Sequence, residues 1–128
     1  MADKRILVAE DNVAMAGVIR FNLQRAGFAV TLASSGSIAW DLLCQEDFDL
    51  LVTDVQMPGL TGGELCLRLR QDPRLAALPV LLLTAKGLEL DTDYYLRQLG
   101  VRAIIPKPFS PREMIRTVQE CLAEPVPA

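Results

Sequence analysis

Side chains that could bind a cation or an anion follow four short apolar segments of this 128-residue chain. They are two acids after ILVA, one acid ending LLVTD, a hydroxyl ending LLLT and an amine after AIIP: Glu10, Asp11, Asp54, Thr84 and Lys107. Any one of them alone could be a helix cap, a turn residue or a solvated surface charge. As a set they suit the binding of a metal ion and a phosphate.

The charges of this set indicate the chemistry. Three crowded carboxylates repel one another, so one would tend to be protonated unless positive charge compensates. A divalent cation and the Lys107 ammonium would supply that charge, and Mg²⁺ is usually held by one or two carboxylates, waters and a phosphate oxygen. A carboxylate can be phosphorylated as a nucleophile, and metal, ammonium and hydroxyl groups stabilise the transferred group. We therefore expect phosphoryl transfer.

The elements that must position these residues alternate between strand and helix. Near-continuous apolar runs predict strands over residues 6–9, 28–33, 49–54, 79–84 and 101–105, with helical patterns after each strand. Five such units predict a parallel sheet covered by helices on both faces. Ligands bind such sheets beyond the carboxyl ends of the strands, where the chemical set falls. Asp54 ends the middle strand of the expected order, which makes it the natural nucleophile.

Local signals mark individual helices. Ser110 is an expected N-cap, followed by proline at the first helical position and a glutamate three residues after the cap. An earlier helix is marked by Leu65 and Leu69, and its two arginines, Arg68 and Arg70, are expected to face solvent. A further helix is expected over residues 91–99.

Composition bounds the class of protein. The length fits one domain, which we assign to residues 1–123, with the Pro-rich residues 124–128 as a tail or the start of a linker. A net charge of −3 gives no basic field for nucleic acid. No apolar run is long enough to cross a bilayer and no signal peptide precedes the first strand, so we expect a cytoplasmic protein without a membrane partner.

Cysteine and histidine usage narrows the chemistry further. The three cysteines, Cys44, Cys66 and Cys121, are far apart, fall in helical patterns and form no CxxC motif. We interpret them as small free thiols rather than as a metal or redox site. The chain has no histidine, so acid–base catalysis by histidine within the chain is excluded.

Four motifs carry a resemblance to a known family. VAED at residues 8–11, DVQMPG at 54–59, LLTAK at 82–86 and PKPF at 106–109 resemble, in order and spacing, those of response regulator receiver domains. These domains are the phosphoacceptor modules of two-component signalling, and the likeness covers about residues 4–123. It implies a flavodoxin-like, doubly wound α/β fold with a five-stranded parallel sheet in the order 2-1-3-4-5 and five flanking helices.

The resemblance implies a role for each site residue. Asp54 is similar to the phosphorylated aspartate of the family, and Glu10 and Asp11 to the acidic pair that holds Mg²⁺ together with it. Gln56 resembles the residue whose backbone carbonyl completes the metal site. The commoner acidic pair is Asp-Asp, so Glu10 departs from it by one methylene.

Two further residues are implied on the phosphoryl side. Thr84 resembles the hydroxyl residue that bonds the phosphoryl group, and Lys107 resembles its ion-pair partner. The Lys107–Pro108 peptide is expected to be cis by analogy, which proline makes inexpensive. Gln56 and Lys86 resemble the variable positions that tune how long the phosphoryl group lasts.

The expected output surface departs from the family. Ile104 stands three residues before Lys107, where the family often has a tyrosine or phenylalanine that moves with the threonine. Either Ile104 is an ordinary strand residue, or its coupling to a partner is altered. The resemblance implies a downstream protein partner on the face made by the helix at 91–99, the strand at 101–105 and the last helix. Tyr94 and Tyr95 could belong to that face, or one ring could pack inside and the other lie exposed.

These implications define the expected function and its alternatives. A sensor histidine kinase or a histidine phosphotransfer protein would phosphorylate Asp54 with Mg²⁺, and the product would switch a partner-binding surface. The chain would not be an enzyme with a separate turnover substrate. The alternative is a pseudo-receiver that binds partners without phosphorylation. A phosphatase is disfavoured because Gln56 replaces its second, acid–base aspartate, and a flavin carrier because the first loop is acidic.

Overall fold

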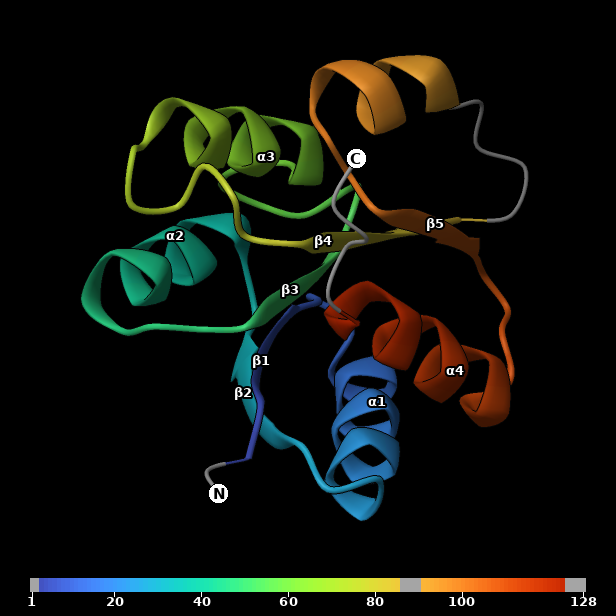
Figure 1. Cartoon of the computed structure of the whole chain (residues 1–128). Helices are drawn as coiled ribbons and strands as arrows, with labels where there is room; N and C mark the ends of the chain where they lie inside the picture. The colour runs from blue at the N-terminus through green and yellow to red at the C-terminus, as the bar shows by residue number, and fades with distance from the viewer. Residues whose placement is uncertain (1–2, 86–90, 124–128) are drawn as a thin grey trace.

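The computed structural model describes residues 3–85 and 91–123. Lys86 and the Pro-rich residues 124–128 therefore lie outside the described residues. A five-stranded parallel sheet forms the centre of the molecule (Figure 1), with the strand order β2-β1-β3-β4-β5. Its strands are β1 (Arg5–Ala9), β2 (Ala29–Ala33), β3 (Leu50–Asp54), β4 (Val80–Thr84) and β5 (Ala103–Pro106). This order confirms the prediction.

The described helices cover both faces of the sheet. They are α1 (Val13–Arg25), α2 (Gly36–Gln45), α3 (Gly62–Gln71), the short π-helix η1 (Tyr94–Gln98) and α4 (Pro111–Leu122). Figure 1 shows α1 and α4 on one face, and α2 and α3 on the other. A helix is present within the predicted range 91–99, but residues Tyr94–Gln98 have π rather than α geometry.

Two hydrophobic clusters result from the alternation of side chains along each buried strand. On the first face, strand residues such as Leu7, Leu51 and Leu82 pack with α2, α3 and the segment around Leu99; we call this cluster the α2/α3 layer. On the other face, Ile6 and its strand neighbours pack with α1 and α4, in what we call the α1/α4 layer. Every residue of β3 and β4 is buried, as expected for inner strands of a doubly covered sheet.

Side-chain caps fix the helix starts beside the site. Asn12 accepts a hydrogen bond from the Met15 N–H at the start of α1. Ser110 accepts one from the Glu113 N–H at the start of α4, which confirms the predicted N-cap. At α3, Thr61 and Glu64 form a reciprocal capping box.

Arg70 corrects one sequence-based expectation. Its guanidinium does not face solvent: Nε donates to the Leu99 carbonyl at 2.6 Å and Nη1 to the Leu78 carbonyl at 2.8 Å. The group ties α3 to the segments that lead into β4 and β5. Arg68 is exposed, as expected, and lies over the ring of Trp40 on α2, 5.6 Å from its centroid.

Among the described residues, none of the helices combines the length and the apolar character that a bilayer crossing requires.

Candidate phosphoacceptor and metal site

The acidic residues meet because β1 and β3 are parallel neighbours. Ala9 lies opposite Thr53 in their register, so Glu10 and Asp54 leave the sheet side by side at its carboxyl edge. Both are buried, with 2% of Glu10 and 7% of Asp54 exposed, whereas Asp11 is exposed. Ionised side chains are rarely buried without a partner, so this pair demands compensating positive charge.

Lys107 supplies part of that charge. Its Nζ lies 2.6 Å from Asp54 Oδ2 and 2.8 Å from Glu10 Oε1. Its backbone N–H donates to the Thr84 carbonyl at 2.7 Å, which fixes the segment after β5 against the end of β4. The Lys107–Pro108 peptide is cis, as predicted.

The pKa values of this group reflect competing causes. Burial raises the pKa of Glu10, although hydrogen bonds from Lys107 and the Asn12 N–H oppose that change. Burial alone would lower the pKa of Lys107, but hydrogen bonds to Asp54 and Glu10 outweigh it, so its pKa is raised. Lys107 is therefore a firmly charged ammonium group at neutral pH.

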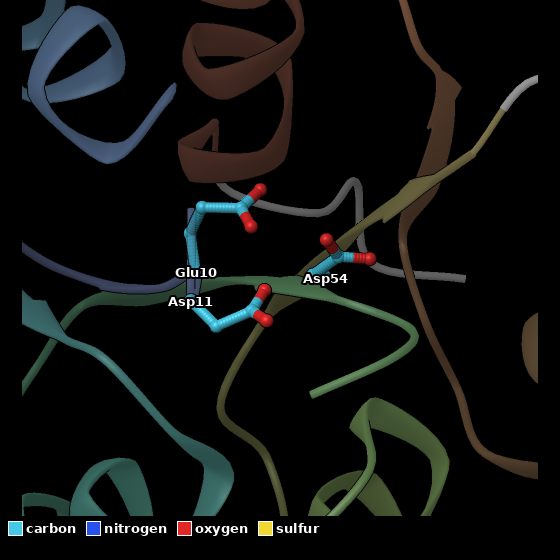
Figure 2. Close-up of side chains that lie close together, drawn as sticks. All are labelled: Glu10, Asp11 and Asp54. Atoms are coloured by element: carbon cyan, nitrogen blue, oxygen red, sulfur yellow. The ribbon is translucent and has the colours of Figure 1, made fainter. Parts of the chain in front are cut away.

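The three carboxylates converge on one small space (Figure 2). One oxygen from each of Glu10, Asp11 and Asp54 lies within 4.8 Å of the others. Both oxygens of Glu10 already accept hydrogen bonds, Oε1 from Lys107 and Oε2 from the Asn12 N–H at 3.2 Å. Within residues 3–85 and 91–123, three carboxylates against the one ammonium of Lys107 leave an excess of negative charge, and hard oxygen ligands are what Mg²⁺ prefers. The residues fit a magnesium ion by their chemistry.

Gln56 contributes its backbone to the same place. Its N–H donates to Asp54 Oδ1 at 3.2 Å, while its side chain is exposed. The two oxygens of Asp54 thus have different partners, Lys107 on one side and the loop after β3 on the other. The role of the Gln56 carbonyl as a metal ligand stays a prediction.

Thr84 ends β4, the next strand along from β3. Thr84 is 8% exposed, and its Oγ1 has no hydrogen-bond partner within residues 3–85 and 91–123. An unsatisfied buried hydroxyl costs about 1–3 kcal/mol. A hydroxyl that lacks an internal partner at the ligand edge of the sheet is suited to bond an incoming oxygen acceptor.

The expected output residues lie on one side of the sheet. Ile104 is half-buried in β5, opposite Leu82, and packs on the α2/α3 layer. Tyr95 packs on the same layer, whereas Tyr94 is 38% exposed, and their ring centroids are 5.5 Å apart. One ring packs inside and the other is exposed, as one of the two alternatives predicted. Whether these residues report on the site stays a prediction.

Sequence reasoning missed Asn12. Its side chain caps α1 while its backbone N–H holds Glu10, so one residue joins the helix start to the acidic cluster. The available signal was an asparagine directly before a helical pattern.

Comparison with known proteins identifies the class that this fold and site define. The family model for the response regulator receiver domain matches residues 6–119. The chain belongs to this family, in the two-component signalling class.

Individual relatives agree with this assignment. The chain is 40% identical over 120 residues to the alkaline phosphatase synthesis transcriptional regulatory protein PhoP of Bacillus subtilis, a match that covers 94% of this chain and 49% of that protein. It therefore spans about half the length of this curated relative. Among solved structures, a putative response regulator from Chloroflexus aurantiacus is 32% identical with a TM-score of 0.88, covering 96% of this chain and all of that one. Chemotaxis response regulator CheY4 of Vibrio cholerae is 26% identical with a TM-score of 0.86, covering 94% of this chain and all of that one.

Proposed function

We propose that Asp54 accepts a phosphoryl group and that this modification switches a partner-binding surface. One observation carries the proposal: a buried carboxylate at the ligand edge of the sheet is held 2.6 Å from the Lys107 ammonium and beside two further acids. This is an arrangement for a negatively charged group that arrives together with a divalent cation. The Thr84 hydroxyl, which has no partner in the described part of the chain, supports the same interpretation.

In this proposal the donor is a phosphohistidine on a sensor histidine kinase or a histidine phosphotransfer protein. It must lie on another molecule, because this chain has no histidine. An oxygen of Asp54 attacks the phosphorus, a P–O bond forms and the P–N bond breaks. The electron pair of that bond stays on the ring nitrogen, and the ring leaves as neutral imidazole because its other nitrogen carries a proton in the phosphohistidine donor. Glu10, Asp11 and Asp54 would hold Mg²⁺, which supplies charge neutralisation on the phosphoryl oxygens.

The residues of this chain then respond to the new group. Lys107 exchanges its contact with the Asp54 carboxylate for one with a phosphoryl oxygen, and the Thr84 hydroxyl donates to another. Movement of Thr84 at the end of β4 biases the surface made by η1, β5 and α4, where a downstream protein docks. The chain assists its own phosphorylation and dephosphorylation in the cytoplasm, without a separate turnover substrate.

A pseudo-receiver is the second candidate, and Ile104 is the observation that favours it. An aliphatic residue at this half-buried position of β5 offers no ring or hydroxyl to a partner. In that case the same surface would bind its partner irrespective of phosphorylation.

Mass spectrometry after incubation with acetyl phosphate and Mg²⁺ tests the proposal. We expect the mass of one phosphoryl group on the peptide that contains Asp54, and no gain in an Asp54→Asn variant. An unchanged mass of wild-type protein under these conditions would overturn the proposal and leave the pseudo-receiver. A partner pull-down that compares phosphorylated protein with Asp54→Asn then tests the switch itself.

A further inference from the structure

The loop between β3 and α3, residues 55–61, is pressed against the N-terminus of α2. The Gly36 N–H donates to the Pro58 carbonyl at 3.2 Å. A Cβ on Gly36 would overlap the Leu60 carbonyl oxygen and lie 2.6 Å from its carbon and 2.8 Å from Leu60 Cβ. Backbone atoms form this contact, so a side chain at Gly36 could be accommodated only if the loop moved.

The same loop is also fixed at its two ends. The Gly62 N–H donates to the Val55 carbonyl at 2.8 Å, and a Cβ on Gly62 would lie 3.0 Å from Val55 Cα. The loop is therefore closed at its base by Gly62 and held in its middle by Gly36. Gln56 lies between these two attachments, two residues after Asp54 and two before Pro58.

The α2 side of this contact is rigid. Ser35 caps the helix by accepting a hydrogen bond from the Ile38 N–H at 3.1 Å, which fixes the backbone on either side of Gly36. Gly36, Ala39 and Leu43 are all buried, and Ala39 and Leu43 belong to the α2/α3 layer. Strain introduced at Gly36 would therefore displace the loop rather than the helix.

We propose that Gly36 is a positioning residue for the metal side of the site, an inference that rests on the proposed function. A shift of Pro58 and Leu60 moves Gln56, whose N–H holds Asp54 Oδ1 at 3.2 Å. The orientation of the Asp54 carboxylate and the place of the Gln56 carbonyl then both depend on the N-terminus of α2. This helix sets the affinity for Mg²⁺ although it contributes no ligand.

Titration with MgCl₂, followed by amide NMR spectra, tests this inference on matched variants. Gly36→Ala is expected to weaken Mg²⁺ binding about tenfold, the lower end of the usual cost of disturbing groups that orient metal ligands. Gly17→Ala is the control, because Gly17 lies in α1 and a Cβ there meets nothing within 4 Å. Val118→Ala, on α4 across the sheet, controls for lost stability without a change in the loop. Equal affinity in folded Gly36→Ala and wild type would overturn the inference.

A second measurement needs no variant and remains valid if Gly36→Ala does not fold. In wild-type protein, saturation with Mg²⁺ should shift the Gly36 amide resonance and slow its hydrogen exchange, because the Gly36–Pro58 bond tightens with the loop. A Gly36 amide that does not change at saturation contradicts the inference. Absence of any Mg²⁺ binding to wild type would instead count against the metal site of the proposed function.

Discussion

Lys107 and Asp54 are joined by a contact of 2.6 Å between Nζ and Oδ2, although 53 positions separate them in the chain. The contact brings the loop after β5 to the end of the central strand. The same ammonium reaches Glu10 after β1, so one side chain links three strand ends. Its loss should affect metal binding and phosphoryl transfer in opposite directions.

Lys107→Ala is expected to bind Mg²⁺ more tightly, because the carboxylate cluster loses the ammonium that pairs with Glu10 and Asp54. Phosphorylation at saturating Mg²⁺ should nevertheless slow by about a hundredfold, the usual cost of removing one electrostatic donor. A metal titration and the rate of labelling by acetyl phosphate measure the two effects. Lys4→Ala removes an exposed lysine and should change neither; a parallel rise or fall of both quantities in Lys107→Ala would contradict the assignment.

Thr84 and Thr53 form a matched pair for testing the Thr84 hydroxyl, which lacks a hydrogen-bond partner among the residues that the structure describes. Thr84→Val keeps the side-chain shape and removes the unsatisfied Oγ1, so the free energy of unfolding should rise by about 1 kcal/mol. Thr53 is also buried, but its Oγ1 donates to the Asp54 carbonyl at 3.0 Å, so Thr53→Val should lower that free energy by a similar amount. Urea denaturation of unphosphorylated protein gives both values. A Thr84→Val variant less stable than wild type would show that the hydroxyl has a partner in solution.

The capping box of α3 predicts a pH dependence of stability. Hydrogen bonds from the Thr61 backbone and side chain lower the pKa of Glu64. Because the folded pKa lies below the unfolded one, the contribution of Glu64 is present above the unfolded pKa and is lost as pH falls through the folded pKa. Glu64→Gln should therefore be less stable than wild type at neutral pH, and the difference should shrink as the pH falls below about 4, the ordinary pKa of a free glutamate.

Glu113 provides the matched control for this measurement. Glu113 stands three residues after the Ser110 cap, as Glu64 stands three residues after Thr61. Within the described residues, the Glu113 N–H donates to the Ser110 hydroxyl, but the return bond from the Ser110 N–H to the Glu113 side chain is not formed. The difference between Glu113→Gln and wild type should change less with pH. An equal pH dependence for the two variants would rule out the specific role of the Thr61–Glu64 box.

The three cysteines should differ sharply in reactivity. Burial raises the pKa of Cys66 to about 12 and also raises that of Cys121, whereas Cys44 is exposed on α2. The thiolate is the reactive form, so iodoacetamide at pH 8 should modify Cys44 alone in the native protein. Peptide mapping locates the adduct, and urea should make all three sites react. Fast modification of native Cys66 would show that α3 opens readily.

Much of the fold could be predicted because inner parallel strands are apolar on both faces. The segments that end at Asp54 and Thr84 are therefore continuous runs, and the carboxyl-edge rule places the residues that follow them. Contacts made by long side chains could not be predicted in this way. The four carbonyls bound by the Arg70 guanidinium, for example, belong to segments brought together only by the tertiary fold.

The π geometry of η1 was also beyond local reasoning. Tyr94 and Tyr95 have no proline or glycine beside them that would mark a change of helical register. The N–H of Leu99 bonds to the Tyr94 carbonyl, and that of Val101 to the Tyr95 carbonyl. These bonds fix the segment against the start of β5, and they follow from packing rather than from the propensity of the residues.

The division of the core into two layers has a consequence for observing the molecule by light. Trp40, the one tryptophan of the chain, lies on α2 and packs into the α2/α3 layer beside the exposed Arg68. Ile104 and Tyr95 belong to that layer, whereas α1 and α4 pack on the opposite face. Tryptophan emission should therefore report on the α2/α3 layer, above all on the packing of α2 against α3, and a change confined to the α1/α4 layer should leave the emission unchanged.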